Sequence, residues 1–203
     1  MQNNVMFQFS QDAAMASRES FGITESGAYV GKLSAKYVQG SNGSKSAGIE
    51  FSLECDQGKL NYLTAWYQKK DGTCNTTGYN LVNAIMGLLK LQTLTSKQVG
   101  EDWVCPEFEG KQIGLVVQKE LFTKNDGSEG YKFEIVMPFS AQSRKTLKEA
   151  MANAPATAVD KMIPLLKTKD NRSKAQGGYQ QTSVAQQSNS DNMPDWMQDD
   201  FPA

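Results

Sequence analysis

The stretch IEFSLECDQGKLNYLTAWYQK, residues 49–69, predicts two antiparallel strands joined by a tight turn. Apolar and polar side chains alternate from Ile49 to Cys55, and this period of two is typical of a strand with one buried face. The sequence DQGK at residues 56–59 indicates a hairpin. The segment Leu60–Lys69, rich in aromatic residues, returns as a second strand, and the Asp71-Gly72 pair ends it.

The segments on either side of this hairpin continue the pattern. Residues 29–37 alternate in the same way, with lysines on one face and aromatic or aliphatic side chains on the other. Downstream, apolar residues recur at helical spacing and predict a helix over about residues 80–90. Two further strands are predicted at 113–122 and 131–137, separated by a turn at 125–127.

Five strands with one helix between the third and the fourth is the order of the OB-fold, a small and partly open barrel. We therefore expect a mostly β protein, with an OB-fold barrel and a C-terminal helical extension within residues 1–172. In the extension, Ser143 is the expected N-cap of a basic helix that turns Leu147, Ala150 and Met151 inward. The following segment, 159–167, contains a proline and predicts a poor helix.

Charge is distributed unevenly along the 203 residues. Beyond Arg172 the chain carries one Lys against four Asp, a net −3, so the preceding part carries +2 within the total of −1. Residues 173–190 are rich in Gln, Ser and Asn, and we expect 173–203 to form a disordered linker followed by an acidic tail. A mildly basic body with an acidic tail suits a protein that binds a polyanion.

The last residues of the chain combine carboxylates with large aromatic rings. We expect Asp195, Trp196, Asp199, Asp200 and Phe201 to form a short motif that binds a partner protein. The rings would anchor in a pocket, and the carboxylates would meet basic residues around it. Docking of the tail on its own domain, or a tail without function, are the alternatives.

Aromatic side chains alternate with lysines along the predicted strands, which is the combination that binds single-stranded nucleic acid. A ring stacks on a base for about 1–3 kcal/mol, whatever the base, and a cation meets the phosphate. Neighbouring residues in a strand point to opposite faces, so Trp66 and Tyr67 cannot both face the core. The alternative for each ring is packing inside the barrel. The candidate nucleic-acid-binding residues are Lys32, Lys36, Tyr37, Tyr62, Trp66, Tyr67, Lys69, Lys70, Lys119, Phe122, Lys124, Tyr131 and Lys132.

The sequence gives little support to catalysis or to a membrane role. The chain has no His and no phosphate-binding glycine motif, so we expect no enzyme, no metal and no cofactor. It has no run of 18 apolar residues, and its first ten residues lead us to expect no signal peptide. Three cysteines without CxxC spacing favour a reducing compartment, and hence the cytoplasm.

Several segments resemble the single-stranded DNA-binding proteins, most closely those encoded by bacteriophages. They are residues 27–33 (GAYVGKL), 48–53 (GIEFSL) and 79–88 (YNLVNAIMGL), followed by the polar linker and the acidic DDFPA terminus. The resemblance covers about Phe21 to Phe139 and the tail. It implies an OB-fold that coats single-stranded DNA, and a tail that recruits replication and repair enzymes. The chain ends in Ala203 rather than the family's Phe, so capture of a terminal Phe carboxylate is not implied.

The expected function is therefore sequence-independent binding and protection of single-stranded DNA during phage replication, recombination or repair, in the cytoplasm of the host. Two alternatives stay open. The barrel could be an adaptor for other proteins without any nucleic-acid role, which an acidic face formed by Glu50 and Glu54 would favour. It could also bind RNA.

Overall fold

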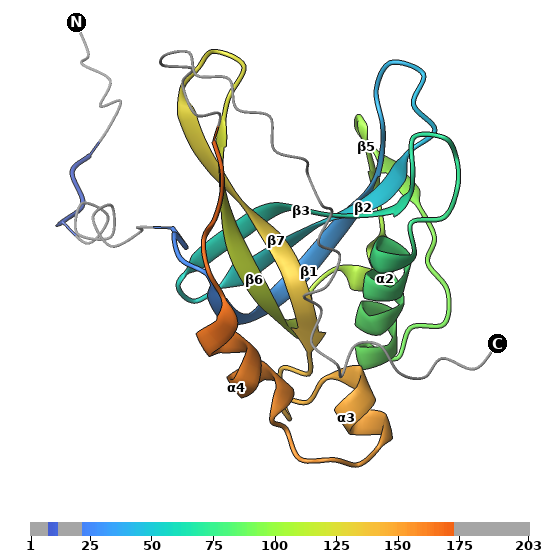
Figure 1. Ribbon diagram of the computed structural model, residues 1–203, viewed down its shortest axis with the longest axis vertical. Coiled ribbons are helices and arrows are strands. Elements are labelled where there is room, and N and C mark those ends of the chain that lie inside the picture. The colour runs from blue at the N-terminus through green and yellow to red at the C-terminus, as the bar shows by residue number, and fades with distance from the viewer. Residues whose placement is uncertain (1–7, 12–21, 173–203) are drawn as a thin grey trace, which may run out of the picture. The chain divides into compact units, whose positions relative to one another are not determined.

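The structure, a computed structural model, describes residues 8–11 and 22–172 (Figure 1). Residues 173–203, which hold the predicted linker and tail, lie outside the described residues. The strands are β1 (Gly27–Gln39), β2 (Ala47–Cys55), β3 (Gly58–Gln68), β4 (Lys97–Val99), β5 (Asp102–Val104), β6 (Lys111–Thr123), β7 (Glu129–Phe139) and β8 (Lys169–Asn171). The helices are α2 (Thr76–Leu88), α3 (Leu147–Met151) and α4 (Ala158–Met162), with 3-10 turns at Pro106–Phe108 and Ile163–Leu165. The prediction of a mostly β protein is confirmed.

The long strand β1 organises the sheet. One edge of β1 pairs with β2, which pairs in turn with β3. The other edge is shared, because residues 27–33 pair with β6 while Lys36 and Tyr37 pair with β5. β7 pairs with β6, and β8 joins β6 as a parallel strand. Within the described residues, β3 and β7 approach each other without a shared ladder, so the sheet is not closed and the predicted OB-fold barrel stays a prediction.

The core lies on one face of this sheet, where the alternation predicted it. Leu33, Phe51 and Leu63 are buried, and cross-strand neighbours of β1, β2 and β3 lie on the same face. Helix α2 covers this face with Val82 and Ile85. The helix approaches β3 closely because Gly78 has no side chain, and a Cβ there would collide with the carbonyl oxygen of Trp66.

The helices differ from the prediction in their limits. α2 begins at Thr76 rather than near Asn80, and it ends at Leu88. The N-cap of α3 is Thr146, not Ser143, because Thr146 and Glu149 form a reciprocal capping box that no residue near Ser143 can match. The expectation that Ala150 and Met151 face inward is wrong, since α3 has five residues and the Met151 side chain is 81% exposed.

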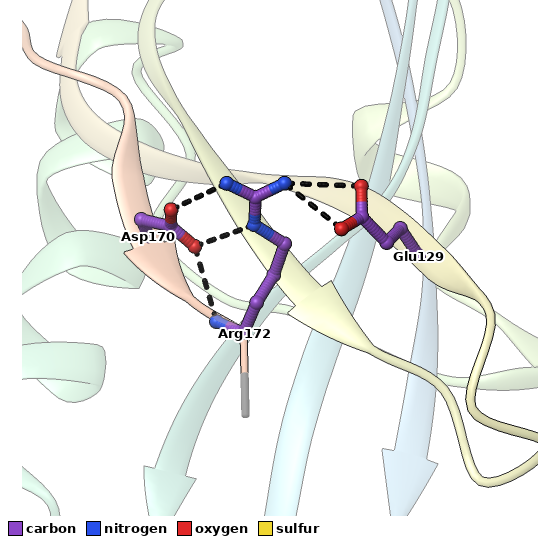
Figure 2. Close-up of polar contacts among 3 residues, drawn as sticks. All are labelled: Glu129, Asp170 and Arg172. Atoms are coloured by element: carbon purple, nitrogen blue, oxygen red, sulfur yellow. Dashed lines mark hydrogen bonds and ion pairs between the residues drawn. The ribbon is translucent and has the colours of Figure 1, made fainter. Parts of the chain in front are cut away.

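The C-terminal segment returns to the sheet and is fastened there by Arg172 (Figure 2). Its guanidinium donates to Asp170 through Nε at 2.8 Å and Nη2 at 2.6 Å, and Nη1 donates to both carboxylate oxygens of Glu129 at 3.0 Å. Strand β8 is thereby held at the start of β7. Among the described residues, no helix is both long and apolar enough to cross a membrane.

Candidate nucleic-acid interface

An aromatic platform lies on the outer face of the sheet, opposite the core. Trp66 on β3 pairs with Gly48 on β2, and its side chain is 38% exposed. A Cβ built on Gly48 would lie 3.1 Å from Cε3 of the indole. The ring therefore lies against the bare backbone of Gly48, with part of its surface open to solvent.

An open hollow of about 960 Å³ lies beside this ring, lined by residues 39–44 and Ser46 on one side and by Gln68, Lys69 and Lys70 on the other. The backbone N–H of Lys45 donates to the carbonyl oxygen of Lys70 at 3.1 Å, which joins the two segments. Lys45, Lys69 and Lys70 take part in none of the ion pairs of the described chain. Lys69 and Lys70 line the hollow and can offer charge to an anion there, although the charge of Lys69 also acts on the nearby carboxylate of Asp71. Lys45 lies next to the hollow through its bond to Lys70.

The other half of the outer face carries balanced charge. Lys36 Nζ lies 3.4 Å from Glu50 and 3.2 Å from Asp102, and the hydrogen bond to Asp102 is the main cause of its raised pKa. Lys32 lies opposite Glu54 in the register of β1 and β2. These two predicted lysines thus face carboxylates, and this part of the face offers less to a phosphate than the Trp66 end.

Tyr62 is the most exposed aromatic of the sheet, at 75%. It lies at a register shift between β2 and β3, where two consecutive residues of β3 are out of step with the partner strand. Its backbone φ is +62°, a left-handed conformation that is uncommon for a side chain of this size. The bulge turns the ring to solvent beside Ser34 and Ser52, on the same face as Trp66.

The predicted residues on β6 and β7 form a separate group. Lys119 Nζ lies 3.4 Å from Glu25 and 5.0 Å from the centroid of the Tyr131 ring. Lys132 lies 3.3 Å from the buried Glu120. Phe122 and Lys124 lie at the end of this hairpin, where both approach Gly130. In Figure 1 the β6–β7 hairpin and the loop between β1 and β2 project apart from each other, so these residues do not join the Trp66 hollow.

Tyr37 and Tyr67 lie on the opposite face from Trp66. Both are half-buried against the core, and they line a hollow next to α2. Burial raises the pKa of the Tyr67 hydroxyl, and its neighbours Tyr37 and Cys105 raise it further. As expected from the strand, Trp66 and Tyr67 take opposite faces, and Trp66 is the more exposed.

Sequence reasoning missed four residues around these surfaces: Lys45, Gly48, Tyr79 and Trp103. Gly48 had a signal, since a glycine inside a strand often marks a close approach of another group. Lys45 belongs to a Gly/Ser-rich loop, and Trp103 lies in a strand of three residues, where no periodicity can be read. The predicted tail residues, Asp195, Trp196, Asp199, Asp200 and Phe201, lie outside the described residues.

No protein-family model matches this chain, and no curated protein matches it significantly in sequence.

Proposed function

We propose that this protein binds single-stranded DNA without sequence preference through the outer face of β2 and β3. The observation that carries the proposal is the partly exposed Trp66 ring, which lies against Gly48 beside Lys69 and Lys70, two lysines without ion-pair partners among the described residues. The ring offers a face for an unstacked base, and the lysines offer charge to the phosphates that flank it. In a duplex both faces of each base are already stacked, so the site favours a single strand.

The strand order supports an OB-type barrel. The order β3-β2-β1-β6-β7, with α2 after β3 and the free edges of β3 and β7 close together, follows the five-stranded arrangement of that fold. In OB-folds the second and third strands and the first hairpin loop form the surface for oligonucleotides. Trp66 belongs to β3 and Lys45 to the loop between β1 and β2, which are the corresponding elements, and Lys69 directly follows β3.

The wider role follows from the resemblance in sequence. We place the protein in phage replication, recombination or repair in the reducing cytoplasm of the host, as a binding protein rather than an enzyme. Its acidic tail recruits partner proteins through Trp196 and Phe201. DNA is preferred to RNA in this proposal on the resemblance alone, since stacking on Trp66 suits either. The alternative of a protein adaptor depended on an acidic face that includes Glu50, and Lys36 neutralises this carboxylate. The structure therefore favours the adaptor less than DNA binding.

Titration with oligo-dT, duplex DNA and oligo-U at two salt concentrations tests the proposal. Trp66→Ala should weaken single-strand binding about 5- to 150-fold, the equivalent of one lost stack. Lys69→Gln should flatten the dependence of log affinity on log salt by about 0.7. Lys161→Gln, at an exposed position of α4, is the matched control and should leave the slope unchanged. Equal affinity for duplex and single strand would overturn the proposal. Absence of binding at low salt would also overturn it, and would favour the alternative of a protein adaptor.

A further inference from the structure

A second aromatic hollow lies on the other face of the sheet. Trp103 on β5 lies directly opposite Tyr37 on β1, and together with Gln39 and Ser96 they line a hollow of about 390 Å³. Tyr37 and Ser96 also line the neighbouring hollow of about 580 Å³ next to α2, together with Tyr79. The two hollows are therefore adjacent at these shared residues.

The hollow beside Trp66 and the hollow beside Trp103 meet at Gln39, the last residue of β1. Gln39 lines both the hollow beside Trp66 and the hollow beside Trp103. Its side-chain amide donates to the hydroxyl of Tyr37 at 2.7 Å, so it is held against the second hollow. A chain that follows the first hollow can thus pass over Gln39 to reach Trp103.

The chemistry of the second surface suits uncharged aromatic groups. Trp103 is 46% exposed and Tyr79 is 52% exposed, although both have the size of core residues. Among the described residues that line the hollows beside Trp103 and Tyr79, there is no Lys, Arg, Asp or Glu. The polar lining consists of amides and hydroxyls, such as Asn83, Gln92 and Ser96, which can donate to and accept from the edge of a base.

We infer that the single strand bound at Trp66 continues over the end of β1 and stacks further bases on Trp103 and in the hollow beside Tyr79. This inference rests on the proposed function, because it supplies the occupant. The charged hollow holds phosphates and bases, while the uncharged hollows hold bases only. Short oligonucleotides fill the Trp66 hollow, and longer ones also reach Trp103.

The chain has three Trp residues, which allows each surface to report separately. In the full-length protein, one variant keeps only Trp66 (Trp103→Phe with Trp196→Phe), and another keeps only Trp103 (Trp66→Phe with Trp196→Phe). Fluorescence is titrated with oligo-dT of increasing length. We expect the Trp66 reporter to be quenched by short and long oligonucleotides, and the Trp103 reporter only by longer ones.

Affinity gives an independent readout. Trp103→Ala should weaken binding of long oligo-dT by about 5- to 150-fold, change binding of the shortest oligonucleotides little, and leave the salt slope unaltered. Val99→Ala in the same hairpin is the matched control for disturbance of β4 and β5, and should bind as the wild type. If Trp103→Ala does not fold, as judged by thermal melting, the Phe-based reporters still decide.

The two possible failures are distinct. Quenching of Trp66 at every length, with no response of Trp103 at any length, would overturn the inference and keep the proposed function. If the fluorescence of neither reporter changes at low salt, both the inference and the proposed function are overturned.

Discussion

Replacing Glu149 with Gln should destabilise the protein at neutral pH and remove part of its sensitivity to acid. The carboxylate fastens the C-terminal extension. Oε2 accepts from the N–H and hydroxyl of Thr146 at 2.9 and 3.0 Å, and Oε1 accepts from the N–H groups of Thr157 and Ala158, both at 2.8 Å. The amide of the Glu149→Gln variant has only one acceptor oxygen, so its NH₂ group would face an N–H donor on one of the two sides.

The size of the effect follows from the pKa of this carboxyl. Partial burial acts to raise it, but the hydrogen bonds from Thr146, Thr157 and Ala158 outweigh burial and lower it from 4.5 to about 2. At about 1.4 kcal/mol for each pKa unit, the upper limit is about 3 kcal/mol. Because the side chain is partly exposed, solvent screening reduces the expected free energy to about 2 kcal/mol.

The sign with pH follows from the lowered pKa. The stabilisation is fully present above the unfolded value near 4.5 and is lost as the pH falls from there toward 2. Urea denaturation of wild type and Glu149→Gln at several pH values between 7 and 3 measures it. The gap should be about 2 kcal/mol at pH 7, or about 4–8 °C in melting temperature, and should narrow below pH 4.5.

The control is Asp160→Asn, which removes the exposed ion pair with Arg144 and should cost no more than about 1 kcal/mol. A Glu149→Gln variant within about 0.5 kcal/mol of the wild type, with the same acid profile, would refute the reasoning.

Three further predictions concern the sheet and the tail. Gly78→Ala should destabilise the protein by about 1–3 kcal/mol in urea denaturation, because its methyl group would push α2 off the carbonyl of Trp66; unchanged stability would contradict the close approach. Gly48→Val should displace the indole of Trp66 and weaken oligo-dT binding with little change in the salt slope; wild-type affinity would show that the glycine is not needed under the ring. Deletion of residues 191–203 removes four Asp carboxylates and no cation, so it should raise the affinity for single-stranded DNA, most strongly at low salt. It should also abolish capture of phage or host replication proteins in pull-downs. Retained capture would show that the tail does not bind these partners.

The sequence was sufficient where periodicity was long. β1 and β2 alternate over several residues, so the inward face of Leu33 could be assigned, and in β3 the sequence showed that Trp66 and Tyr67 take opposite faces without saying which one is exposed. The three-residue strands carry no such signal. The start of α2 was missed because its first turn, Thr76-Thr77-Gly78, consists of poor helix formers that tertiary packing on β3 holds in place.

Ion pairing was the part of the candidate site that could not be predicted. Lys36 meets Asp102 and Lys119 meets Glu25, partners that are 66 and 94 positions away in the chain. A lysine on the exposed face of a strand therefore looks equally free whether or not a distant carboxylate neutralises it. Lys69 and Lys70 line the hollow beside Trp66, and only the fold shows that the backbone of Lys45 is bonded to Lys70.

The shared edge of β1 also has a consequence for how the chain folds. β1, β2 and β3 are consecutive hairpins, whose local contacts form early, whereas residues 27–33 must wait for β6 at 111–117. At a synthesis rate of about 5–20 residues per second, that edge stays without its partner for about 4–16 s on the ribosome. An unpaired strand edge is a template for the wrong chain. The nascent protein therefore passes through a period of exposure to aggregation, which ends when β6 docks.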